Sequence, residues 1–252
     1  MTGRLYVIGV GPGDPELLTL KGARIIKEVK CICVPKGKEE GSSLALSIIK
    51  GAVNISGKEI MEAYFPMRKT RAKSREQRAE SKNDNPGSIS YELDSRWQET
   101  IEAVYSRLNK GIDMAFLTIG DPAIYSTFFY LYDKLLKLNP ELKIEIIPGV
   151  SSINASAARA KISLALADEK IAILPANYMD NLKDTLEQFD TVVLMKVYKV
   201  FDDLIRALDE MHLLKNAVYV SRAGMGDEKI VRNIQDVKRE DLNYFSMVII
   251  RK

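Results

Sequence analysis

The sequence predicts an α/β protein of two domains, with a mainly parallel N-terminal sheet and a mixed C-terminal sheet. Apolar runs typical of strands alternate with runs of helical periodicity, which favours parallel strands connected by helices. The 252 residues suffice for two domains of modest size. The last two strand-like runs, 228–234 and 245–252, flank a short polar turn and predict a closing hairpin, which makes the second sheet mixed.

The first half of the chain contains four predicted strands. They cover residues 4–10, 31–35, 58–65 and 112–120. Apolar residues at helical spacing predict helices over 18–29, 42–53, 94–111 and 126–138. The third helix should begin at a cap on Asp94 or Ser95 and end at Gly111. This order indicates a parallel sheet with helices on its faces.

The second half continues the alternation. Strands are predicted over 143–147, 170–176, 190–197 and 216–224, and helices over 153–161, 179–189 and 201–211. We place the domain boundary where the fourth strand of the first half ends. The first domain then covers 1–118, with a basic insertion at about 66–92, and the second covers 119–252.

Composition narrows the class of protein. No apolar run approaches the roughly 20 residues that span a bilayer, and no secretion signal opens the chain, so we expect a cytoplasmic protein without membrane contact. Cys31 and Cys33 are too closely spaced for a zinc ribbon and are typical of a buried strand. His212, the single histidine, cannot supply a multi-histidine site and suits a helix end. We expect no metal site.

Three glycine-containing turns, 9–15, 118–127 and 146–156, each follow a predicted strand. Ligands of parallel α/β proteins bind beyond the carboxyl ends of strands, so the three turns are expected to converge on one cleft. The first, "GVGPGDP", has the wrong glycine spacing for a dinucleotide, and its prolines lack N–H donors. This first turn therefore predicts a rigid wall of a cavity. For each of the three turns the alternative is a structural connector without a ligand.

Several ordered segments resemble the tetrapyrrole methylase family. They are "LYVIGVGPGDPELLTLKGARII", "FLTIGDPAIYST", "IIPGVSSINASAA", "VVLMKV" and "VSRAGMGDEKIV", and together they extend over essentially the whole chain. The resemblance implies a non-Rossmann, two-domain fold, S-adenosylmethionine as methyl donor, an active site in the cleft between the domains, and a homodimer. Within the family, "SLALSI", "FPM" and "GDPAIYST" are most similar to the C20-methyltransferases of cobalamin synthesis, which act on precorrin-2 or cobalt-factor II.

The resemblance also implies which residues contact the methyl donor. They are Gly11, Pro12, Gly13, Ile119, Gly120, Asp121, Ile124, Ser151, Ser152, Met195 and Ala223. Ile119 departs from the glycine that is commoner at its position, and Ala223 replaces a common glycine. Backbone donors, small residues and apolar walls suit a ligand that has no phosphates.

Side-chain roles retain alternatives. Tyr125 is our candidate catalytic residue, as a hydrogen-bond or proton-transfer group, or it packs at a domain interface. Asp121 orients the donor or caps the following helix, and Asp14 braces its turn. The basic run 68–82 is either a solvated loop or a lid whose Arg68, Arg71 and Arg75 bind the carboxylates of an acidic tetrapyrrole.

Other functions remain open at this point. They are methylation of another ring carbon, a diphthamide or ribosomal RNA methylase, and a non-enzymatic tetrapyrrole carrier. Nucleic-acid binding is not expected, because the basic run lacks a recognition motif and interleaved aromatic residues.

Overall fold

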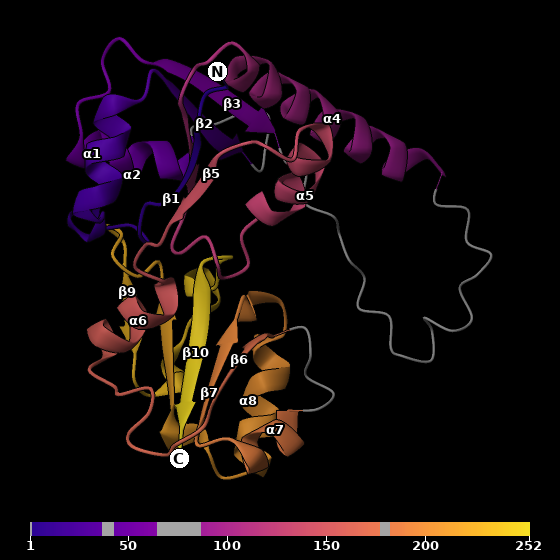
Figure 1. The fold of residues 1–252 in the computed structure, drawn as a ribbon. Helices are drawn as coiled ribbons and strands as arrows, with labels where there is room; N and C mark the ends of the chain where they lie inside the picture. Colours follow the sequence, from indigo (N-terminus) through magenta and orange to yellow (C-terminus); the bar gives the residue numbers. More distant parts are fainter. Residues whose placement is uncertain (1, 37–42, 65–86, 177–181) are drawn as a thin grey trace. The chain divides into compact units, whose positions relative to one another are not determined.

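The computed structural model describes residues 2–36, 43–64, 87–176 and 182–252 (Figure 1). The chain divides into two compact units, Met1–Val150 and Ser151–Lys252. The boundary expected after residue 118 is corrected by this division. Strand β5 (Ile144–Ile147) pairs in parallel with β1 (Leu5–Gly9), which draws residues 119–150 into the first unit.

The first unit is built on a five-stranded sheet in the order β3-β2-β4-β1-β5. Every strand pair in it is parallel, as expected. The remaining strands are β2 (Cys31–Lys36), β3 (Glu59–Tyr64) and β4 (Met114–Thr118). Because all five strands run the same way, their carboxyl ends share one edge of the sheet.

Helices cover both faces of this sheet (Figure 1). Helices α1 (Leu20–Glu28) and α2 (Leu44–Ala52) pack on the core that contains Ile8 and Leu117. Helices α4 (Gly87–Asn109) and α5 (Phe128–Leu138) pack on the opposite core, which contains Val7 and Phe116. Each fully buried apolar side chain contributes roughly 1.5–3 kcal/mol to stability.

Helix α4 begins at Gly87, earlier than the expected cap at Asp94 or Ser95. Residues 88–93 contain no proline or glycine that would stop a helix, so it continues toward the N-terminus. The end of the expected insertion 66–92 is therefore part of α4.

The second unit contains a mixed sheet in the order β6-β7-β10-β8-β9. Its strands are β6 (Ile171–Pro175), β7 (Thr191–Met195), β8 (Ala217–Ser221), β9 (Lys229–Val231) and β10 (Ser246–Arg251). Among the strands that the structure describes, β6 pairs with β7 in parallel. Strand β10 is antiparallel to both β7 and β8, and β9 is antiparallel to β8. The mixed sheet confirms the prediction.

The predicted closing hairpin is wrong. Strand β9 pairs with β8, whereas β10 lies between β7 and β8. The physical reason is burial, because five of the six residues of β10 are buried and such a strand belongs at the centre of a sheet. Strand β9 has no buried residue and takes the edge.

Helices of the second unit are α6 (Ser152–Ala160), α7 (Leu182–Gln188) and α8 (Phe201–Glu210). Short 3₁₀ turns complete it: η3 (Val197–Lys199), η4 (Leu214–Asn216), η5 (Ile234–Asp236) and η6 (Arg239–Asp241). Helices α7 and α8 bury leucines against β7 and β10 in one core, and α6 packs against β8.

The cysteines and the histidine lie where the sequence predicts. Cys31 and Cys33 are free thiols, fully buried in one core of the first sheet. His212 is exposed and follows the end of α8. Among the residues that the structure describes, no three metal-ligating side chains come together, and no helix combines the length and apolar character needed to cross a membrane.

Candidate functional site

The turns after β1 and β4 are joined through their backbones. The Gly120 N–H donates to the Gly11 carbonyl oxygen at 2.8 Å, and the Gly11 N–H donates to the Gly120 carbonyl oxygen at 3.4 Å. Both glycines have positive φ angles, +80° for Gly11 and +71° for Gly120, which glycine adopts without steric cost. Turns 9–15 and 118–127 therefore lie together, as the sequence predicts.

The third turn touches the first two backbone to backbone. A Cβ on Gly149 would lie 2.4 Å from the Gly120 carbonyl oxygen and 2.7 Å from the carbonyl carbon of Gly9. A Cβ on Gly9 would lie 2.6 Å from the same Gly120 oxygen. No side chain fits at either position, so these two glycines let the three turns converge. Gly9 and Gly149 were not among the expected contact residues. Each lies within two residues of a buried residue near the end of a strand.

The carboxylate of Asp121 connects the second turn to the third. One oxygen, Oδ1, accepts the Ala123 N–H at 2.7 Å within the turn. The other, Oδ2, accepts the Gly149 N–H at 3.0 Å. Hydrogen bonds to a charged acceptor are stronger than those to a neutral one. Asp121 thus holds two strand-end turns together, a role that neither cofactor orientation nor helix capping describes.

The first turn combines a buried proline with a short 3₁₀ start. Pro12 is buried, and Gly13 is half-buried. Asp14 caps η1 (Pro15–Leu17) by accepting the Glu16 N–H at 2.9 Å, and Pro15 occupies its first position. This confirms that Asp14 braces its turn. The cap and the fixed φ of proline restrict the backbone of this turn.

The segment after Asp121 exposes the candidate catalytic residue. Ile119 packs against the core of the first sheet, and the Ile124 N–H donates to the Asp121 carbonyl oxygen at 3.2 Å. Tyr125 is 52% exposed and has a φ of +53°, which is uncommon for a residue with a side chain. Such backbone strain is frequent at functional sites. Its chemical role stays a prediction.

In the second unit, Met195 and Ala223 lie at the same edge of the sheet. Met195 ends β7 and pairs with Met247 of β10, which also pairs with Val220 near the end of β8. Both β7 and β8 are antiparallel to β10, so their carboxyl ends share one edge. Ala223 is buried and follows β8 by two residues.

Ser151 and Ser152 begin helix α6. The Ser151 hydroxyl is the N-cap and accepts the Ile153 N–H at 3.0 Å, and Ser152 is the first helical residue. Ser151 is buried and Ser152 is half-buried. Helix capping explains a serine at 151 without a ligand.

The turn that carries Ala223, residues 222–228, is the feature that the sequence did not reveal. The Gly224 N–H donates to Oε2 of Glu228 at 2.6 Å, and Arg222 Nε donates to Oδ1 of Asp227 at 2.6 Å. Arg222 and Gly224 both have positive φ angles. Glu228 was not among the expected residues, and only the folded turn shows its contact.

Among the expected residues, Gly11, Gly120 and Asp121 are brought together in the first unit, and Met195 and Ala223 share one edge in the second. Arg68, Arg71 and Arg75 lie outside the described residues. Their role in binding an acidic substrate stays a prediction.

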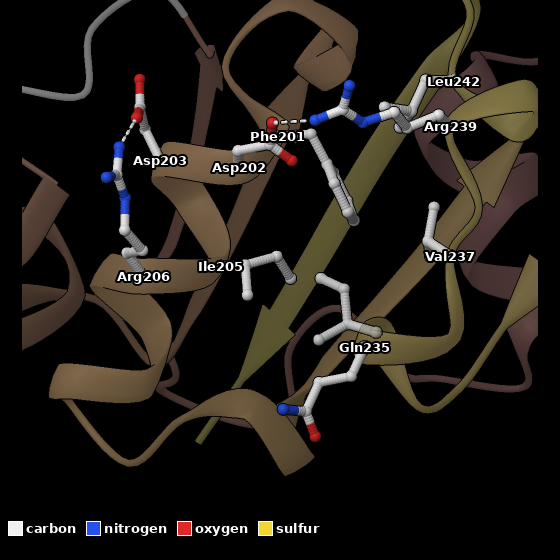
Figure 2. A pocket seen from close by; sticks show the side chains of 10 residues that line it. Phe201, Asp202, Asp203, Ile205, Arg206, Gln235, Val237, Arg239 and Leu242 are labelled. Atoms are coloured by element: carbon white, nitrogen blue, oxygen red, sulfur yellow. Dashed lines mark hydrogen bonds and ion pairs between the residues drawn. The ribbon is translucent and has the colours of Figure 1, made fainter.

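A hollow of about 660 Å³ lies elsewhere in the second unit (Figure 2). It is bordered by α8 and by η5, η6 and their flanking residues. Asp203 pairs with Arg206, and Asp202 Oδ2 lies 3.6 Å from Arg239 Nη2, so the charges at its rim are matched within the protein. The expected contacts do not line it.

Several titratable groups that are buried or ion-paired have shifted pKa values. Burial raises the pKa of the Cys31 thiol to about 11. The Arg107 guanidinium, which donates to Glu59 at 2.8 Å, holds the pKa of that carboxyl below its usual range. In the second unit, the Lys229 ammonium holds the pKa of the Asp241 carboxyl low. All of these shifts accompany packing or ion pairing, not the glycine turns.

Comparison with known proteins identifies the family. Residues 4–237 match the family model described as Tetrapyrrole (Corrin/Porphyrin) Methylases. The chain is 36% identical over 253 residues to a probable cobalt-precorrin-2 C(20)-methyltransferase of Methanocaldococcus jannaschii, covering 99% of this chain and 96% of the relative. It is 31% identical over 254 residues to the cobalt-precorrin-2 C(20)-methyltransferase of Salmonella typhimurium, covering 100% and 98%.

Solved structures share the fold. A cobalt precorrin-4 methyltransferase matches with a TM-score of 0.72 and 21% identity, covering 98% of this chain and 94% of that one. A uroporphyrin-III C-methyl transferase from Thermus thermophilus, complexed with S-adenyl homocysteine, matches with a TM-score of 0.63 and 18% identity, covering 99% and 98%. With the family model and the relatives above 30% identity, these findings show that the chain belongs to the tetrapyrrole (corrin/porphyrin) methylases.

Proposed function

We propose that the protein transfers a methyl group from S-adenosylmethionine to C20 of cobalt-precorrin-2 in cobalamin biosynthesis. The observation that carries this proposal is the full-length match, at 31% and 36% identity, to two relatives named for that reaction. A relative named for metal-free precorrin-2, from Sinorhizobium, is 27% identical over 98% of the chain. The cobalt-containing substrate is therefore favoured over the metal-free one.

The residues of the converging turns fit S-adenosylmethionine. The N–H groups of Gly11, Gly120 and Gly149 all donate within the protein, and Pro12 has none. The turns are thus poorly equipped for phosphate oxygens. Their small residues and apolar walls suit an adenosine and a sulfonium-bearing methionine chain.

When bound, S-adenosylmethionine supplies an electrophilic methyl group on a sulfonium. The role of the protein is to align the reactants. Well-oriented reactants reach effective molarities of roughly 10⁵–10⁸ M. Gly11, Pro12, Gly120 and Asp121 would hold the donor from the first unit. Tyr125 would contact the tetrapyrrole, since it is exposed within the second turn.

Methyl transfer with a labelled donor tests the proposal. The protein is incubated with methyl-labelled S-adenosylmethionine and either cobalt-precorrin-2 or precorrin-2, and NMR locates the label. We expect one methyl group, at C20, with the cobalt-containing substrate preferred. Relatives named cobalt-precorrin-4 C(11)-methyltransferase are 25% and 26% identical, and labelling at another carbon would assign the protein to such a branch. No transfer to either substrate would refute the proposal.

We also propose a homodimer, which the family resemblance implies. Phe129, Tyr130 and Leu138 of α5 expose apolar surface that association would bury. Sedimentation velocity should show a species of twice the chain mass, and a monomer at micromolar concentration would refute it.

A further inference from the structure

Glu228 contacts the backbone of the turn that carries Ala223. Its side chain is 20% exposed, and its Oε2 accepts the Gly224 N–H at 2.6 Å. Arg222 and Gly224, on either side of Ala223, have φ angles of +53° and +78°. A left-handed conformation is costly for arginine and persists only where the surroundings hold it. The Glu228 carboxylate contributes to this hold through Gly224, beside the bond from Arg222 to Asp227, because a bond to a charged acceptor is strong.

The same carboxylate oxygen also faces helix α6. Oε2 of Glu228 lies 3.5 Å from Nε of Arg159, near the end of that helix. Helix α6 starts at Ser151 and Ser152, and packs against β8, which leads into the Ala223 turn. A single oxygen therefore connects the Ala223 turn to the helix that carries two further expected contacts. Arg232, just after β9, adds a bond from Nη2 to the Ala160 carbonyl oxygen at 2.7 Å.

We propose that Glu228 is a positioning residue for methyl-donor binding, which acts by holding the Ala223 turn against α6 before the donor arrives. The inference rests on the proposed function, because Ala223 is an expected contact of S-adenosylmethionine. A turn that is already ordered spares the ligand the cost of ordering it. Loss of a hydrogen bond to a charged group should therefore weaken donor binding by about tenfold to hundredfold.

Glu169 provides a matched control in the same unit. Its Oε2 accepts the Leu166 N–H at 2.7 Å, and its two carboxylate oxygens lie 3.0 and 2.8 Å from Nη2 of Arg251. It thus makes the same two kinds of bond as Glu228. Glu169 precedes β6, and Arg251 ends β10, so this cluster lies at the sheet edge opposite Met195 and Ala223.

The experiment measures S-adenosylmethionine affinity by calorimetry for wild type, E228A, E228Q and E169A, together with unfolding in urea. We expect E228A to bind about tenfold to hundredfold more weakly. E228Q should be intermediate, because glutamine keeps a neutral acceptor for Gly224. E169A should lose comparable stability and keep wild-type affinity. In kinetics, the KM for the donor should rise in E228A, and the KM for the tetrapyrrole should not.

Three outcomes would overturn the proposal. Wild-type affinity in E228A would show that the bond does not position the donor, and an equal loss in E169A would show a general effect of stability. A rise only in the tetrapyrrole KM would place the turn at the other substrate. If E228A does not fold, E228Q against E169Q makes the same comparison. Failure of wild type itself to bind the donor would instead refute the proposed function.

Discussion

Replacement of Gly149 with alanine should force the three glycine turns apart. The added Cβ would lie 2.4 Å from the Gly120 carbonyl oxygen and 2.7 Å from backbone atoms of Gly9. Atoms in ordinary contact lie near 3.5 Å, so the turns must separate by about 1 Å. That shift would stretch the 3.0 Å bond between the Gly149 N–H and Asp121 beyond hydrogen-bonding range. Overpacking and the loss of that bond each cost about 1–3 kcal/mol, so we expect a loss of about 3 kcal/mol.

Urea denaturation and donor calorimetry test this expectation together. G149A should unfold at a lower urea concentration than wild type and bind S-adenosylmethionine more weakly, because the turns no longer converge. G226A is the stability control, since a Cβ at Gly226 meets nothing within 4 Å. It should leave the free energy of unfolding within about 0.5 kcal/mol of wild type. If G149A unfolds at the same urea concentration as wild type, the close packing at Gly149 does not stabilise the three turns, and the reasoning is refuted.

Three further predictions concern single groups. D121N keeps an acceptor for the Ala123 N–H but faces the Gly149 N–H with an amide group. Urea denaturation should show that the free energy of unfolding falls by about 1–3 kcal/mol. Unchanged stability would contradict the bond to Gly149. Cys31 and Cys33 should resist a thiol reagent at pH 8 until the protein is unfolded. Burial raises the pKa of both thiols, and it raises that of Cys31 to about 11. Rapid labelling of the native protein would contradict this prediction. Lys229 lowers the pKa of the Asp241 carboxyl. The ion pair therefore contributes its full stability when the pH is above the ordinary aspartate pKa of about 4, and the contribution is lost as the pH falls through the lowered pKa. The unfolding free energy of D241N should therefore fall less steeply in acid than that of wild type, and equal slopes would exclude this contribution.

The sequence by itself determined the strands of both sheets and the positions of the glycine turns. Apolar runs identified the strands of both sheets, and Cys31 and Cys33 fell in one of them as expected. Glycines behind strand ends indicated turns at one sheet edge, and Pro12 argued against a phosphate cradle. The strands, the buried cysteines and the joined turns were predictable because periodicity and the backbone freedom of glycine are local properties, which a short segment displays without its neighbours. The argument from Pro12 stays a prediction.

Only the tertiary structure decided which segments are neighbours. Strand β5 joined the first sheet and moved the unit boundary to Val150, and β10 displaced β9 from the predicted hairpin. The bonds from Asp121 to Gly149 and from Glu228 to Gly224 also appeared only in the fold. A strand's pattern shows which of its faces are buried but not which strand lies beside it, and a carboxylate's partner depends on how the chain returns. Pairing is decided by the total burial of the assembled sheet, a quantity that no single segment contains.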